Sequence, residues 1–271
     1  MSGSNRPPRS ARLPRLPRLL RLVWLSVWRS SLSQWSWRSF MVTLVVGEAV
    51  TPLLGLFVWS AALPGDPTVS TYYVVLLAVQ LMTVSYEHHT LSNGIYDGNL
   101  AAALVQPQPL VVDIFGANVG LRIWHLIFGL PLIVVAAVFT GVRVEPAAVA
   151  LAIPALLLAA LLRFAFTYAL ALSALWTQRA HGVVGLGETL IFLLGGTAAP
   201  LSLLPDPYRS LGSVLPFWSM LGMPAEIAAG NLHGSALAQA YGVQIGWLVL
   251  VTAVVTAVWR LGLRRFTAVG G

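Results

Sequence analysis

Hydrophobic residues are concentrated in six long stretches of this chain, and short polar or proline-containing breaks separate them. A bilayer core is about 30 Å thick, and a helix of about 20 apolar residues crosses it. The stretches are continuous rather than alternating, so they predict helices and not the strands of a barrel. We therefore expect an all-α integral membrane protein with six transmembrane helices in a single domain, residues 38–265. The expected spans are residues 40–63, 71–91, 118–139, 147–176, 183–203 and 241–261.

The segment before the first span has a different pattern. Leu19, Val23 and Val27 recur at helical spacing, while arginines occupy other faces of the same helix. This apolar run is interrupted by charge and is too short to span, and its tryptophans suit the headgroup region. We predict an amphipathic interfacial helix at residues 16–37 and a basic disordered tail at residues 1–15.

Composition supports the membrane assignment. Hydrophobic residues make up 57% of the chain, charged residues 9%, and the mean hydropathy is +0.79, which leaves too little polar surface for a soluble globule. Cysteine is absent, so disulfides and thiolate metal sites are excluded. Lysine is absent as well, which removes the lysine that a phosphate-binding loop requires.

The arginines predict the orientation. Eight of them precede residue 40, where there is no acidic residue, and Arg260, Arg264 and Arg265 lie at the other end of the chain. By the positive-inside rule both termini are cytoplasmic, as an even number of spans requires. We expect a multi-pass protein of the plasma (cell inner) membrane.

Two interruptions between the spans are unusual. In residues 92–113, an Asp97-Gly98 turn precedes a predicted short helix that Pro107 and Pro109 stop. Residues 200–236 are mostly apolar, yet prolines divide them into pieces too short to cross. This predicts an outward re-entrant hairpin between the fifth and sixth spans, since such backbone is tolerated at membrane depth where protein covers it. A surface loop with Tyr208 and Trp218 at the interface is the alternative.

These features resemble the permease subunit of a type-2 ABC exporter, in the branch that pairs two permeases with a separate ATPase. The resemblance covers residues 35–263. A pattern I-x-x-G-x-L-x-x-x-L-x-x-P that follows the second span in this branch is matched by Ile95, Gly98, Leu100, Leu104 and Pro107. Near the re-entrant segment the matching residues are Gly196, Pro200, Leu201, Leu215, Pro216, Phe217, Pro224 and Gly230. The chain departs from the pattern at Tyr96 and Gln106, where the family often has charged residues.

The resemblance implies a function and a set of partners. The short helix would be a coupling helix, with Leu100 and Leu104 presenting one apolar knob to an ATPase subunit. A second permease, identical or related, would complete the path in the lipid bilayer. ATP and Mg would bind to the ATPase, with no cofactor, metal or catalytic site on this chain and no nucleic-acid partner. Pro200, Pro205, Leu215, Pro216 and Phe217 would belong to an outer re-entrant gate past which cargo leaves by alternating access.

Ionisable residues inside spans are candidate functional residues. Glu48 and Arg163 lie at similar depths and form a candidate intramembrane ion pair, which would either line the path or neutralise two buried charges. Glu87-His88-His89 is a weak metal motif because adjacent histidines on a helix point about 100° apart.

One structural and two functional alternatives therefore remain open. Residues 92–113 could be an ordinary interhelical loop without a coupling role. A secondary transporter would show an inverted repeat with broken helices in matching positions. A membrane enzyme that modifies lipids would require clustered polar residues at the bilayer surface.

Overall fold

The computed structural model describes residues 16–177 and 180–265, and these residues form helices without any strand. The predicted disordered tail, residues 1–15, lies outside the described residues. In chain order the helices are α1 (Leu16–Trp35), α2 (Arg38–Ala62), α3 (Pro67–Thr83), α4 (Glu87–Tyr96), α5 (Asn99–Leu104), α6 (Leu110–Thr140), α7 (Pro146–Leu172), η1 (Ser173–Leu175), α8 (Ala180–Leu194), η2 (Leu201–Leu203), α9 (Tyr208–Val214), α10 (Pro216–Met220), α11 (Gly222–Ala228) and α12 (Gly234–Arg265).

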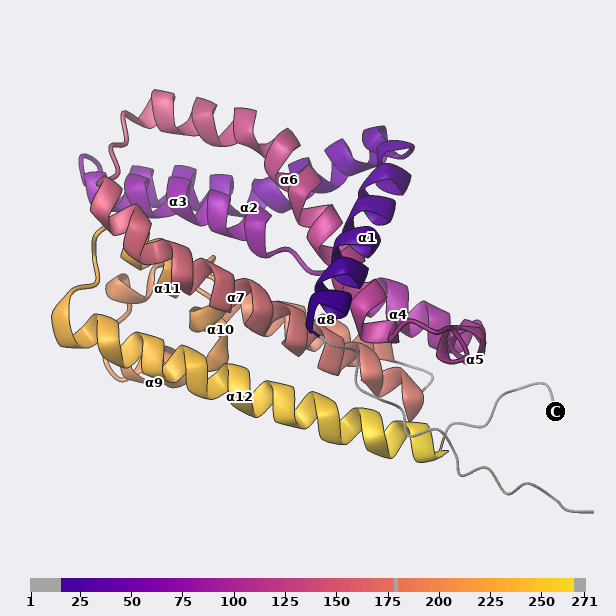
Figure 1. Cartoon of the computed structure of the whole chain (residues 1–271). Coiled ribbons are helices and arrows are strands. Elements are labelled where there is room, and N and C mark those ends of the chain that lie inside the picture. Colours follow the sequence, from indigo (N-terminus) through magenta and orange to yellow (C-terminus); the bar gives the residue numbers. More distant parts are fainter. Residues whose placement is uncertain (1–15, 178–179, 266–271) are drawn as a thin grey trace, which may run out of the picture.

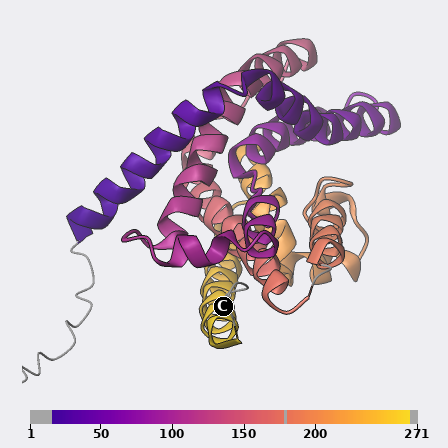
Figure 2. The same cartoon turned by 90° about the vertical axis from the view of Figure 1, so that its right-hand side faces the viewer.

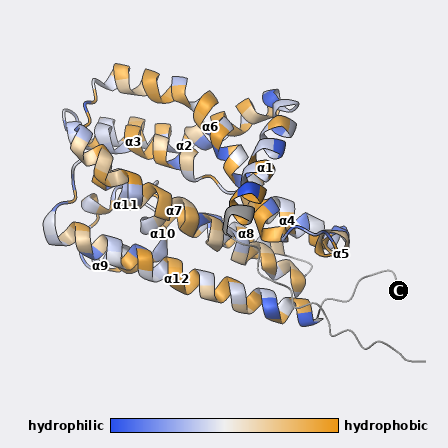
Figure 3. Ribbon diagram, in the orientation of Figure 1, coloured by the Kyte–Doolittle hydropathy of each residue, from blue (hydrophilic) through white to orange (hydrophobic). Residues whose placement is uncertain are grey.

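Four of the helices in the described residues are long and apolar enough to cross a membrane: α2, α6, α7 together with η1, and α12. They run side by side along the long axis of the molecule (Figure 1). Apolar residues cover most of their length, and hydrophilic residues gather at the end that carries α1 and α5 (Figure 3). These helices confirm the predicted first, third, fourth and sixth spans as long apolar helices.

The predicted second and fifth spans are shorter helices in the structure. The sequence predicted one continuous helix over residues 71–91, but α3 ends after 17 residues and residues 84–86 separate it from α4. α8 ends after 15 residues, and Gly196 then adopts a left-handed conformation with φ of 92°. The count of six continuous spans is therefore not confirmed.

The segment predicted as an interfacial helix forms a helix, α1, and its position at a membrane interface stays a prediction. It runs across one end of the bundle instead of along it, as two perpendicular views show (Figure 1 and Figure 2). Its predicted apolar face packs on α6, where Val27 is buried, while Trp24 and Trp28 are exposed. One face of α1 therefore packs on the protein, and the opposite face is exposed.

Close approach between α1 and α6 depends on two glycines. A Cβ at Gly116 would lie 3.0 Å from the carbonyl carbon of Ser26, and one at Gly120 would lie 3.0 Å from Ser31 Oγ. The spacing G-x-x-x-G puts both on the same face of α6, where small residues let helices meet. Arg29 of α1 adds an ion pair with Asp113 of α6.

The core is organised around α7, which contacts α3, α4, α8, α10, α11 and α12. Ala148, Ala152, Ala155 and Ala159 are buried and recur every three or four residues, so they form one stripe on α7. Their small side chains let neighbouring helices approach closely.

Prolines determine the short helices that precede α12. Pro207 precedes α9 and Pro216 is the first residue of α10, positions at which the missing N–H costs nothing. α10 and α11 are buried throughout, and Met220 and Met223 are fully inaccessible.

We expect Gly116→Leu to lower the stability of the folded protein by about 1–3 kcal/mol, because the added side chain overlaps α1. Thermal unfolding of the detergent-solubilised protein measures the effect as a lower midpoint. Gly47→Leu on α2 is the matched control, since nothing lies within 4 Å of its Cβ position. Equal midpoints for the two variants would contradict the packing argument.

Candidate functional site

α4 and α5 form a hairpin that projects beyond the bundle, at the end where α1 lies and α12 finishes (Figure 1). Gly98 makes the turn with φ of 74°, a conformation that favours glycine. α5 follows as the predicted short helix, ending at Leu104, and Pro107 and Pro109 separate it from α6. The local structure at Gly98 and Pro107 is as the sequence predicted.

The two leucines of α5 do not form one exposed knob. Leu100 is only 2% exposed and packs into the chain itself, whereas Leu104 is 38% exposed. The prediction of one exposed pair of leucines is wrong here, because Leu100, at the start of α5 beside α4, is covered by the chain, whereas Leu104 lies at the exposed end of the helix. The exposed apolar surface lies further along, at Leu104, Val105 and Pro107, which we call the α5 tip; Val105 is 84% exposed.

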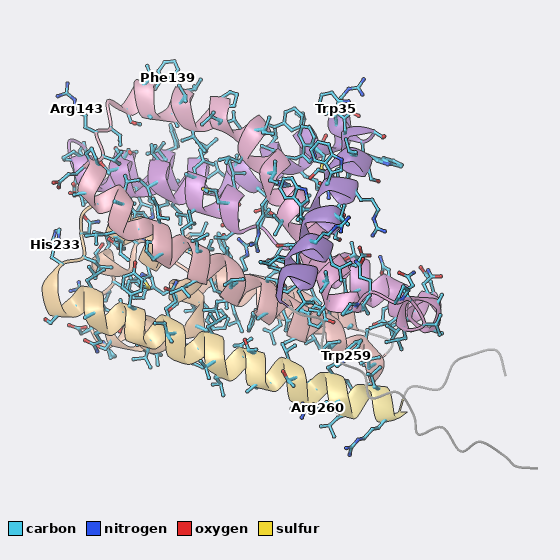
Figure 4. All side chains as sticks on the ribbon, viewed as in Figure 1. Trp35, Phe139, Arg143, His233, Trp259 and Arg260 are labelled. Atoms are coloured by element: carbon cyan, nitrogen blue, oxygen red, sulfur yellow. The ribbon has the colours of Figure 1, made fainter. Side chains whose placement is uncertain are left out.

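A cleft of about 510 Å³ lies behind the α5 tip. One wall is the segment that joins α5 to α6, and the opposite wall is the last part of α12 with Trp259 and Leu263. Figure 4 places Trp259 and Arg260 at this end of the molecule and Arg143 and His233 at the other.

α4 is fixed to the bundle through α7. Leu91 and Ile95 pack with Tyr168 and Leu172, and Ser92 Oγ donates a hydrogen bond to the carbonyl oxygen of Ala171 at 3.3 Å. Ile95, a predicted coupling residue, therefore anchors α4 to α7 instead of facing outward.

Tyr96 connects the hairpin to the start of α8. Its hydroxyl donates to the carbonyl oxygen of Thr177 at 3.0 Å and accepts from the backbone N–H of Ala180 at 3.0 Å. Ala180 is the first residue of α8, where N–H groups lack partners inside the helix. Tyr96 thus caps α8 from α4, a role that sequence reasoning missed when it treated the tyrosine only as a departure from the motif.

Glu48 and Arg163 are not in direct contact. Glu48 accepts hydrogen bonds from Gln80 Nε2 at 2.6 Å and from the Tyr86 hydroxyl at 2.8 Å. Arg163 is 3% exposed, and its Nη1 donates to Thr83 Oγ1 at 3.3 Å. Both residues therefore bind the end of α3 and the break after it, so the predicted pair belongs to a larger polar cluster.

Arg122 of α6 is central to that cluster and was not identified from the sequence. Its Nε donates to the carbonyl oxygen of Val84 at 2.9 Å, and its Nη2 donates to that of Ala160 at 2.9 Å and to Ser85 Oγ at 3.2 Å. The side chain holds the break between α3 and α4 against α6 and α7. An arginine inside a predicted span was the signal that could have revealed it.

Glu87 follows this break and is 2% exposed. Thr167 Oγ1 of α7 donates to its carboxylate at 2.6 Å. The side chains of His88 and His89 lie outside the described residues. Within the described part of the chain, no three His, Asp or Glu side chains come together as metal ligands, and the absence of a metal stays a prediction.

Within the segment 200–236, residues 216–228 are buried in the core, whereas most of residues 202–215 and 231–236 are exposed. Leu215 is the N-cap residue of α10 and Pro216 is the first residue of the helix. Phe217 packs edge-to-face on Phe166, and Pro200 is buried whereas Pro205 is exposed. Of the two residues that the surface-loop alternative placed at an interface, Trp218 is only 5% exposed, whereas Tyr208 is 64% exposed, and the re-entrant hairpin stays a prediction.

The comparisons identify relatives at the family level. A family model described as ABC-2 family transporter protein matches residues 21–270, which include every helix from α2 to α12. A search of curated proteins finds no match. The match confirms the resemblance that the sequence motifs indicated. Together with the four long apolar helices, it indicates a multi-pass membrane protein.

Replacing Tyr96 by Phe keeps the ring and removes both hydrogen bonds of the hydroxyl. We expect peptides that contain Ala180 to exchange amide hydrogens about two to ten times faster, the range for one lost hydrogen bond. Hydrogen–deuterium exchange with mass spectrometry measures this. Tyr208→Phe on exposed α9 is the control, and unchanged exchange at Ala180 in Tyr96→Phe would refute the capping role.

Proposed function

Because this chain belongs to the ABC-2 transporter family, we propose that it is the transmembrane permease subunit of an ATP-driven exporter. The observation that carries the proposal is the family match over nearly the whole chain. The projecting α4–α5 hairpin supports it, since this is a short rigid element outside the bundle that a soluble partner can reach.

The proposed membrane arrangement has six crossings. α3 with α4 would form a broken second crossing, and α8 with the turn after it would form the fifth. The end that carries α1, α5 and the last turn of α12 would be cytoplasmic, in the plasma membrane. Its charge agrees with the positive-inside rule: the exposed arginines at this end are Arg21, Arg29, Arg38, Arg260 and Arg264, against Arg143 and Arg209 at the other.

The α5 tip is the proposed contact with the ATPase, which would bind ATP and Mg. Leu104 and Val105 offer exposed apolar side chains, and the prolines after them stiffen the loop. A displacement of the α5 tip would be transmitted to α7 through the packing of α4 and to α8 through the hydrogen bond of Tyr96. The hairpin would therefore convert closure of the ATPase into a rigid-body motion of two crossings.

The complete exporter would contain a second permease, either another copy of this chain or a related one, and would release cargo outward by alternating access. The segment with α9, α10 and α11 would be the re-entrant hairpin at the outer end. The burial of α10 and α11 between α3, α7 and α12 supports that role, because protein covers the irregular backbone of this part of the segment.

A secondary transporter is the second candidate. The second and fifth elements are both shortened, and these are corresponding positions in the two three-helix halves. Interrupted helices at matching positions of inverted halves are typical of that class. A secondary transporter needs no ATPase, which separates the two proposals experimentally.

Purification of the natively expressed protein in mild detergent, followed by mass spectrometry of the proteins recovered with it, tests the exporter. We expect a soluble subunit with a phosphate-binding loop, near one copy per permease. A related six-crossing protein in the same particle would indicate a heterodimer. Recovery of a stable particle without an ATPase would refute the exporter and favour the secondary transporter.

We expect the double variant Leu104→Asp/Val105→Asp to reduce recovery of the ATPase by at least about tenfold, because charges replace the apolar centre of the contact. Quantitative mass spectrometry of the purified complex measures the ratio of the two subunits. The matched control is Leu211→Asp/Val214→Asp, which changes two exposed residues of α9 at the opposite end. Undiminished recovery in the α5 variant would place the ATPase contact elsewhere.

A further inference from the structure

The side of α1 that faces away from the bundle carries a continuous apolar surface. α1 packs on α6 through Ser26, Val27 and Ser31, and the arc beside this contact holds large apolar side chains that are about half exposed or more. These are Leu20, Trp24, Leu25, Trp28, Leu32 and Trp35. At about 100° per residue they fall within an arc of about 140° on the helix. An exposed apolar patch of this extent is typical of a surface that meets a membrane or another molecule.

The placement and composition of this arc favour a membrane. α1 lies across the end of the bundle, as a helix in the plane of a bilayer would (Figure 1 and Figure 2). Tryptophan is enriched at the headgroup level of membranes, and Trp24, Trp28 and Trp35 are all exposed on the arc. Burial of the arc in the acyl-chain boundary would remove its apolar surface from water.

The same segment is strongly basic. Eight arginines and no Asp or Glu precede Glu48 in the sequence. Arg21 lies within the apolar arc, three and four residues before Trp24 and Leu25, and it is exposed. Its methylene groups can lie along these apolar neighbours while the guanidinium group reaches the headgroups. Anionic lipid headgroups would supply the counter-charge that this segment lacks.

Arg38, at the start of α2, is held at the other end of the arc. Its guanidinium group lies over the ring of Trp35, 5.5 Å from the ring centre, and Trp35 stacks on Trp124 of α6 with the ring centres 5.1 Å apart. This cation–π contact orients the guanidinium group and leaves Arg38 exposed. A planar guanidinium group presents paired N–H donors that match the oxygens of a phosphate. Arg38 is therefore a preorganised contact for a lipid phosphate.

One carboxylate connects α1 to the segment that follows the α5 tip. Asp113, in the first turn of α6, accepts a hydrogen bond from Ser26 Oγ at 2.9 Å and forms the ion pair with Arg29. The same oxygen, Oδ1, accepts from Gln108 Nε2 at 3.3 Å. Gln108 lies directly after Pro107 of the α5 tip. The position of α1 on α6 therefore bears on the position of the α5 tip.

We propose that the exposed face of α1 binds anionic phospholipids of the leaflet at this end of the bundle, with Arg21 and Arg38 as contacts to the headgroup phosphates. The tryptophans and leucines of the arc lie at the acyl-chain boundary, and Asp113 transmits the position of α1 to the α5 tip. This inference rests on the membrane arrangement proposed above. It needs no ATPase, so it is tested on this chain alone, and failure to recover an ATPase would leave it standing.

Phosphatidylglycerol and phosphatidylcholine with identical acyl chains are the probes, and native mass spectrometry of the purified chain compares their affinities. We expect phosphatidylglycerol to bind at least about tenfold more tightly, since each arginine near an anionic headgroup contributes about fivefold. Equal binding of the two lipids would overturn the proposal. Glycerophosphoglycerol has the same headgroup without acyl chains and should bind at least about tenfold more weakly than phosphatidylglycerol, because the apolar arc then contributes nothing. Equal binding of these two would assign the arginines to a soluble anion and overturn the lipid assignment.

Two variants locate the headgroup contacts. Arg21→Gln/Arg38→Gln removes two charges from exposed positions, so the preference for phosphatidylglycerol should fall by about tenfold or more. Arg143→Gln is the control, because it removes an exposed arginine at the opposite end of the molecule, and it should keep the full preference. The same preference in both variants would assign the lipid to arginines outside this face and overturn the proposal.

Hydrogen–deuterium exchange tests the connection through Asp113. For the natural protein we expect peptides that cover residues 105–110 to exchange about twofold or more slowly in nanodiscs of phosphatidylglycerol than in nanodiscs of phosphatidylcholine. Asp113→Asn removes the ion pair with Arg29 and leaves Arg21 and Arg38 in place. This variant should keep the lipid preference and lose the effect of the lipid on residues 105–110. Equal exchange in the two lipids for the natural protein, or a lipid effect that persists in Asp113→Asn, would refute the connection.

Discussion

Backbone N–H and C=O groups in apolar surroundings have to find partners within the protein, and this constraint is most demanding where α3 stops and α4 begins. The carbonyl of Val84 accepts from both Arg122 and Asn118 of α6. These side chains replace the intrahelical bonds that the interruption removes, and a cation at the carboxyl end of α3 also suits the helix dipole. The direction of α4, and with it the position of the α5 tip, follows from this arrangement.

The carbonyl groups at the break accept hydrogen bonds from Arg122, so a guanidinium group lies in the core. The other polar side chains of the cluster compensate this buried charge. Burial of an unpaired charge is costly, so acids from several helices surround Arg122 and Arg163. Glu87 interacts electrostatically with Arg122, and Thr167 of α7 orients its carboxylate. Because Arg122 also binds the carbonyl of Ala160, the break in one helix is fixed to two others.

Much of the architecture was predictable because it depends on local sequence. Long apolar runs predicted α2, α6, α7 and α12, while Gly98 and Pro107 predicted the shape of the hairpin. The break after Thr83 was not predictable in the same way, since residues 84–86 contain no Gly or Pro. Its partner, Arg122, lies far away in sequence. The direction in which Leu100 points and the separate contacts of Glu48 and Arg163 likewise depend on tertiary packing, which periodicity does not encode.

The two ends of the bundle are held by different kinds of contact, and this difference bears on how motion would pass along it. At the α5 end, hydrogen bonds from Ser92 and Tyr96 join α4 to its neighbours, and those of Arg122 join α6 to the break before α4 and to α7. At the other end, α10 and α11 are packed by large apolar side chains, with Gln244 of α12 donating to carbonyls of both α7 and α10. Directional bonds exchange partners over small displacements, whereas close-packed side chains resist them. A displacement of the hairpin would therefore change contacts near the break first and move α7, α10 and α12 together as one body.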